Sequence, residues 1–128
     1  MKITSLIARL LLGALFLFAG VNHIHSFFPP QPLPPGPVGQ LEGGMMATGF
    51  MLMVGICEVL PALLLLANRF VPLALLVLAP IIFNIIVINF MMSPMSIFFG
   101  ILLIALWCLT AWRVRSVFFP LVRPKVAE

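Results

Sequence analysis

Charged residues are the scarcest part of this sequence. Only 8% of its 128 residues are Asp, Glu, Lys or Arg, and just three of these are acidic. Soluble domains carry roughly 25% charged residues, because a folded surface must face water. The chain is instead 63% hydrophobic, with a mean hydropathy of +1.27. This composition excludes a soluble globular protein and predicts that lipid covers most of the surface.

Cysteine is also sparse. The chain has two, Cys57 and Cys108, with no CxxC motif and no His/Cys cluster at metal-binding spacing. Both lie in apolar segments, where cysteine usually packs as a small hydrophobic residue. Their expected depths in the membrane differ by roughly 10 Å, which exceeds the reach of a disulfide. We therefore expect neither a metal site nor a disulfide.

The net charge of +4 is by itself compatible with nucleic-acid binding. However, four of the seven Lys and Arg residues follow the last apolar run. Basic residues at that position are typical of a tail beside anionic lipid. We therefore expect the lipid bilayer, and no nucleic acid, as a partner.

Long apolar runs are what the sequence does have. Four of them cover residues 4–23, 50–67, 71–90 and 96–112, and runs of this length match the thickness of the hydrocarbon layer. They are apolar on all sides, which favours helices over the alternating strands of a barrel. The first run resembles a secretory signal, but Arg9 interrupts it and no small-x-small cleavage site follows. We predict an all-α, polytopic membrane four-helix bundle in which residues 1–128 form one domain.

The connecting segments predict the orientation. A proline-rich outer loop over 24–40 holds six of the twelve prolines, and a short interfacial helix is expected over 41–48. We interpret the prolines as a stiff connector, the alternative being a ligand for an aromatic groove. The outer segments 24–49 and 91–95 contain no Lys or Arg, whereas the basic tail 113–128 contains four. The positive-inside rule therefore predicts that both termini lie in the cytoplasm, so that the chain is N-in/C-in.

A polar site is predicted in the interior of the spans, formed by Arg9, Glu58 and Asn84. A charge at the centre of a membrane helix costs about 2.5–3.5 kcal/mol on insertion scales. Counted from the helix ends, Arg9 and Glu58 differ in height by roughly 5 Å, so we predict an ion pair between them. The alternative is that Arg9 reaches the interface and Glu58 is protonated or bonded to Asn84. Asn84 itself is expected to bond another span.

A second polar group is predicted at the outer side, formed by Asn22, His23, His25 and Asn89. His23 continues the helix face of Arg9, Gly13, Phe16 and Gly20. Two histidines at i and i+2 diverge by about 200° on a helix, so they do not share one metal ion. The simpler interpretation is that His23 and His25 anchor the helix at the interface.

The longer motifs resemble the DoxX family. The resemblance is carried by ARLLLGALFLFAGVNHIHSF, PPQPLPPGPVGQLEGGMMATGF, VGICEVLPALLLLANRFVPLALLVLAPIIFNIIVINF and WRVRSVFFPLVRP, which together cover nearly the whole chain. It implies a small four-helix protein of the bacterial inner membrane, with Arg9 and Glu58 at positions that the family usually fills with Arg and Glu. The family is named for a subunit associated with a terminal quinol oxidase and thiosulfate:quinone oxidoreductase. Many relatives carry a His near the end of the third span, where this chain has Ile88, Asn89 and Phe90.

Three functions compete at this point. The first is a membrane subunit of a quinone-linked redox complex with no catalysis of its own, for which quinone is the candidate cofactor and other redox subunits are the partners. The second is a small transporter that uses Glu58 as a proton or cation site, which would require a homo-oligomer because four short spans enclose little volume. The third is a structural or assembly protein whose polar residues only hold helices together. No catalytic residue is identifiable from the sequence.

Overall fold

The computed structural model describes residues 2–25, 32–92 and 97–124, and the described residues contain helices and turns but no strand. Four long helices follow one another: α1 (Lys2–Ile24), α3 (Phe50–Ala67), α4 (Val71–Met92) and α5 (Ile97–Trp112). Three short elements accompany them: α2 (Pro37–Ala47), α6 (Arg115–Phe118) and the 3₁₀ turn η2 (Phe119–Val122). The predicted all-α class is confirmed for the described residues.

The helices have lengths suited to a bilayer. α1, α3 and α4 hold 23, 18 and 22 residues, so they extend about 34, 27 and 33 Å at 1.5 Å per residue. By length and composition all three qualify as membrane spans. α5 has 16 residues, and it qualifies only together with α6 and η2, from which it is bent by 91°. The chain is therefore a multi-pass membrane protein with three or four spanning helices.

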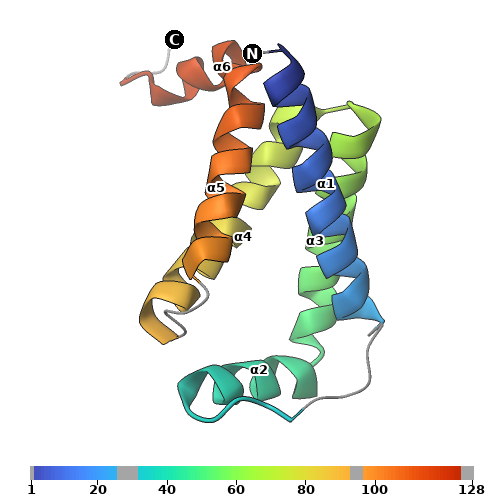
Figure 1. The fold of residues 1–128 in the computed structure, drawn as a ribbon, viewed down its shortest axis with the longest axis vertical. Helices are drawn as coiled ribbons and strands as arrows, with labels where there is room; N and C mark the ends of the chain where they lie inside the picture. The colour runs from blue at the N-terminus through green and yellow to red at the C-terminus, as the bar shows by residue number, and fades with distance from the viewer. Residues whose placement is uncertain (1, 26–31, 93–96, 125–128) are drawn as a thin grey trace.

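The long helices pack as two pairs that contact each other. α1 packs along α3, α4 packs along α5, and α1–α5 and α3–α4 contacts join the pairs. In Figure 1 the two pairs approach each other at the end where α1 begins and α6 lies, and they diverge toward the end crossed by α2. At the first of these ends α1 begins, α3 turns into α4 and α5 ends. It is called the basic end below, because these segments carry Arg9, Arg69 and Arg113.

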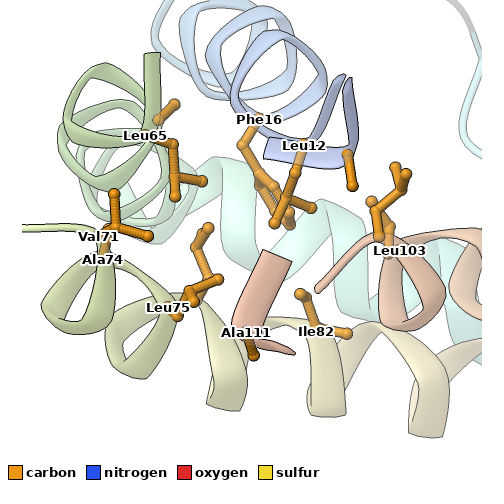
Figure 2. Packing of buried hydrophobic residues seen from close by; sticks show 13 residues of the cluster. Leu12, Phe16, Leu65, Val71, Ala74, Leu75, Ile82, Leu103 and Ala111 are labelled. Atoms are coloured by element: carbon orange, nitrogen blue, oxygen red, sulfur yellow. The ribbon is translucent and has the colours of Figure 1, made fainter. Parts of the chain in front are cut away.

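The hydrophobic core lies in the half of the helices near the basic end. Figure 2 shows apolar side chains from all four long helices directed into one shared interior. The buried apolar residues are Ala8, Leu12, Phe16, Ala62, Leu65, Val71, Ala74, Leu75, Leu78, Ile82, Leu103, Leu106 and Ala111. The outer surfaces remain apolar, with Phe83, Phe90 and Phe98 each at least 66% exposed. An exposed apolar surface of this extent is what a protein covered by lipid presents.

The segment between α1 and α3 differs from its predicted form. α2 covers Pro37–Ala47, so it begins four residues before the predicted start at residue 41. Proline is favoured in the first helical turn, where its missing N–H has no partner to lose, and Pro37 occupies that position after Gly36. Part of the predicted proline-rich loop, residues 26–31, lies outside the described residues, as does part of the basic tail, residues 125–128.

Candidate functional site

The contact between α1 and α3 is closest at two glycines. A Cβ atom added to Gly20 would lie 2.8 Å from the carbonyl oxygen of Gly55, and one added to Gly55 would lie 2.7 Å from the carbonyl oxygen of Gly20. Real side chains do not tolerate such distances, so only glycine permits this approach. Small residues at helix contacts are how membrane helices pack. The two glycines therefore fix which residues of α1 and α3 lie opposite each other.

His23 and Glu58 meet one turn from this contact. His23 Nδ1 lies 2.7 Å from Glu58 Oε1. The Glu58 side chain is only 3% exposed, whereas 28% of the His23 side chain is exposed. A carboxyl group buried among apolar helices is thus paired with a histidine that reaches the surface of the molecule.

The sequence offered a signal for this pair that the prediction did not use. His23 continues the α1 face that contains Gly20, and Glu58 shares the α3 face of Gly55. Both faces are the ones that pack together. Interfacial anchoring alone therefore does not describe His23, because its ring is directed to a buried carboxyl group.

Arg9 finds a different partner. Its Nη1 atom donates a hydrogen bond to the backbone carbonyl of Leu65, in the last turn of α3. The last four carbonyls of a helix lack intrahelical partners and form the negative end of the helix dipole. The Leu65 carbonyl also accepts the backbone N–H of Asn68 at 3.2 Å, so the guanidinium group is a second donor to it and places a positive charge at the negative end of the helix dipole.

The predicted ion pair between Arg9 and Glu58 is wrong. The pair that forms among the described residues is His23–Glu58, and Arg9 is engaged with Leu65. Glu58 lies near the level of Gly20, whose neighbours on α3 are Gly55 and Val59. Gly20 is eleven residues after Arg9, so the two charged residues are separated by about 16 Å along the helix axis.

Side-chain direction increases this separation. The Cα–Cβ bonds of a helix tilt toward its N-terminus. α1 and α3 run in opposite directions, so Arg9 tilts toward the basic end and Glu58 tilts toward the end crossed by α2. The prediction assumed that the two helices end at one level. In fact α1 extends about two turns beyond its contact with Leu65.

Asn84 is also placed differently from its prediction. It is exposed, and its Nδ2 atom donates to the carbonyl of Pro80 one turn earlier in α4, at 3.0 Å. It therefore bonds its own helix, so the expected bond to another span is not formed. Back-bonding of this kind satisfies a polar side chain on a lipid-facing surface.

The remaining members of the predicted outer group lie at different positions. His25 is exposed at the end of α1, and Asn22 is half-buried on the same helix. Asn89 is buried on α4, beside Gly100 of α5. The four residues therefore do not form one cluster: His23 is engaged by Glu58, and Asn89 lies on α4 beside α5.

Metal and thiol chemistry have little support in the part of the chain that the structure describes. Over residues 2–25, 32–92 and 97–124, no three His, Cys, Asp or Glu side chains converge in a geometry that would hold a metal ion. Cys57 and Cys108 are both exposed free thiols. The His23–Glu58 pair is therefore the candidate functional site.

That pair has two electrically neutral states. In one, a protonated His23 donates from Nδ1 to an ionised Glu58; in the other, a protonated Glu58 donates to Nδ1 of a neutral His23. Both states contain the same number of protons, and both leave a proton on His23 Nε2. An uncompensated charge inside a membrane is expensive, and in either of these two states the pair carries no net charge. The half-exposed histidine thus offers one N–H donor to a molecule beside α1.

A family model described as DoxX matches residues 4–94, a range that includes Arg9, His23 and Glu58. No curated protein and no solved structure matches the chain.

Proposed function

The chain belongs to the DoxX family, and on that premise we propose that it is a non-catalytic membrane subunit of a quinone-linked redox complex. Its partners would be redox subunits of the same membrane, with a second copy of this chain as the alternative. The observation that supports this best is the contact of 2.7 Å between His23 and the buried Glu58. Quinones move within the bilayer, and their carbonyl groups accept hydrogen bonds.

The residues at this site suit a quinone headgroup. His23 Nε2 provides the donor, and Glu58 holds the imidazole ring in orientation through Nδ1. A carboxylate that binds one ring nitrogen fixes the role of the other, as it does for histidines at many functional sites. Bound there, a quinone would supply the electron chemistry. His23 would position the quinone carbonyl through Nε2, and Glu58 would share a proton with His23 Nδ1.

The proposal includes a four-helix bundle in the bacterial inner membrane with both termini in the cytoplasm. Arg9, Arg69 and Arg113 all lie on segments at the basic end, and the positive-inside rule assigns such an end to the cytoplasm. α2 would then lie at the outer surface. His23, near the end of α1 that faces α2, would be close to the outer leaflet.

The orientation is testable with single cysteines in a chain whose Cys57 and Cys108 are replaced by Ala. Gly44→Cys places a thiol on the exposed side of α2, and Ser116→Cys places one on α6. A membrane-impermeant maleimide should label Gly44→Cys in intact spheroplasts, and should label Ser116→Cys only after permeabilisation. The reverse pattern would overturn the N-in/C-in orientation.

The quinone proposal is tested by purifying the tagged chain in a mild detergent from its native membrane. Quinone per chain is measured by chromatography, and co-purified subunits are examined for flavin, haem or iron–sulfur absorption. Wild type should retain quinone, and His23→Ala should lose most of it because the donor is gone. Glu58→Gln should lose part of it, since an amide still orients the ring but does not exchange a proton.

Glu42→Gln is the matched control, because Glu42 is a carboxylate on α2 that forms no ion pair among the described residues. It should leave quinone content unchanged. The proposal is contradicted when wild type contains no quinone and no redox subunit, or when Glu42→Gln has the same effect as His23→Ala.

A structural or assembly role is the second candidate. Both polar contacts of the charged intramembrane residues join the same two helices, because His23–Glu58 and Arg9–Leu65 each connect α1 to α3. Two such contacts are expected in a protein whose polar residues serve only to hold its helices together. In that case His23→Ala lowers the thermal stability of the purified protein, whereas wild type has no quinone to lose.

A further inference from the structure

A second polar site lies at the basic end, away from His23 and Glu58. A cavity of about 220 Å³ opens there between the first turns of α1, the α3–α4 turn and the end of α5. Its lining residues are Ser5, Leu6, Arg9, Asn68, Val71, Thr110, Arg113 and Val114. A water molecule occupies about 30 Å³ in the liquid, so the cavity has room for a small ionised group.

The cavity is cationic and has no acidic residue in its lining. Arg9 and Arg113 contribute two guanidinium groups, and neither forms an ion pair among the described residues. Glu58 is committed to His23 about 16 Å away along α1. Arg9 is partly buried at the edge of the apolar bundle and has no acidic partner among the described residues, so a bound anion would offset the cost of its charge.

The hydrogen bonds within the cavity show which groups are available to a ligand. The Ser5 hydroxyl donates to the carbonyl of Leu109 at 3.0 Å, and the Thr110 hydroxyl donates to the carbonyl of Leu106 at 2.8 Å. These two hydroxyls have therefore used their protons inside the protein.

The remaining donors come from three side chains. Arg9 uses one N–H on the carbonyl of Leu65, which leaves the other four N–H groups of its guanidinium group. Arg113 contributes five N–H groups and Asn68 contributes its amide. Donors predominate in the cavity, and two of the three donor groups are always charged.

The position of Asn68 indicates that these donors lie near the boundary between the hydrocarbon layer and the headgroups. Asn68 terminates α3 in a left-handed conformation, with φ of 55°. α3 has 18 residues and a length of about 27 Å, close to the roughly 30 Å of the hydrocarbon layer. Its end is therefore level with the headgroup region. Arg9 lies slightly deeper, and its side chain tilts toward that region.

We propose that this cavity binds the phosphate of an anionic ligand, the group that anionic phospholipids and free phosphate share. Arg9 and Arg113 would flank the phosphate, and Asn68 would add a neutral hydrogen bond. Guanidinium groups bind phosphate oxygens through paired N–H donors, which is stronger and more specific than general attraction to a charged surface. The apolar walls of Leu6, Val71 and Val114 suit the part of a phospholipid that continues into the membrane.

The test uses the full-length chain, delipidated in a mild detergent and titrated with phosphatidylglycerol or phosphatidylcholine, with bound lipid counted by native mass spectrometry. Wild type should bind phosphatidylglycerol about tenfold more tightly than phosphatidylcholine, and Arg113→Gln should weaken phosphatidylglycerol binding about tenfold. Arg9→Gln should show a similar loss. Arg113 is exposed and forms no ion pair among the described residues, so its variant decides the result if Arg9→Gln does not fold.

Arg123→Gln is the matched control, since it removes the same charge from an exposed residue outside the cavity. It should weaken binding by about fivefold at most, because a single surface Lys or Arg contributes about 1 kcal/mol of attraction to anionic lipid. A loss as large as that of Arg113→Gln would overturn the proposal, as would equal binding of the two lipids by wild type.

A competition arm distinguishes the two sources of phosphate. Bound phosphatidylglycerol that persists in an excess of inorganic phosphate identifies a lipid site. Displacement by inorganic phosphate in wild type, with weaker competition in Arg113→Gln, identifies a site for free phosphate. Displacement that is equal in wild type and in Arg113→Gln would overturn a phosphate site at this position.

Discussion

The partner of Glu58 is the most informative feature to perturb, because sequence and structure assign it differently. The structure pairs Glu58 with His23 and pairs Arg9 with the carbonyl of Leu65. Two double-mutant cycles separate these assignments. One combines His23→Leu with Glu58→Leu, and the other combines Arg9→Leu with Glu58→Leu.

The expected coupling energies follow from the geometry. Interhelical hydrogen bonds in membrane proteins average about 0.6 kcal/mol, with a maximum of about 1.7 kcal/mol. The His23–Glu58 contact is short and its carboxyl group is 3% exposed, so we expect a value in the upper part of that range, about 1–1.5 kcal/mol. Sites more than about 10 Å apart add within about 0.5 kcal/mol. Arg9 and Glu58 should therefore show no coupling beyond that limit.

Unfolding in mixed micelles of dodecyl maltoside and sodium dodecyl sulfate provides the assay, with helix content followed by circular dichroism. His25→Leu serves as the control, because the His25 side chain is exposed. Two results together would refute the reasoning. The Arg9–Glu58 cycle would give a coupling energy above about 1 kcal/mol, and the His23–Glu58 cycle would be additive within about 0.5 kcal/mol.

The other predictions concern helix packing. Gly20→Ala should destabilise the protein by about 1–3 kcal/mol through overpacking against α3. Gly44→Ala should not, because a Cβ atom at Gly44 would meet open space. Unfolding in the same mixed micelles measures both variants. Trp107→Phe should cost about 0.5–1.5 kcal/mol, because the indole Nε1 donates to the carbonyl of Leu75 on α4 at 2.9 Å. Trp112→Phe should cost less, since that ring is half-exposed, and equal losses in the two tryptophan variants would show that the interhelical bond contributes nothing.

The helices and their packed faces are predictable from the sequence because each depends on local chemistry. An apolar run must satisfy its backbone as a helix in lipid, and the steps of three and four residues place Arg9, Gly20 and His23 on one face. The face containing Gly55 and Glu58 follows by the same rule. Both faces do meet in the structure.

The partner of each charge was not predictable, because it depends on how far one helix is shifted along another. That shift is set by the approach of Gly20 to Gly55, and sequence periodicity carries no information about it. An error of two turns was enough to exchange His23 for Arg9 as the expected partner of Glu58. Asn84 was misassigned for a different reason, since a bond to Pro80 within its own helix competes with any bond between helices.

The separation of the two charges has a functional consequence. An Arg9–Glu58 ion pair would neutralise both groups and leave neither able to bind a ligand. With Glu58 paired with His23 and Arg9 bonded to a neutral carbonyl, the Arg9 guanidinium group keeps its positive charge without an acidic partner among the described residues. The two sites lie toward opposite ends of the α1–α3 contact. One chain thus holds the His23–Glu58 pair toward the end crossed by α2 and the cationic cavity at the basic end.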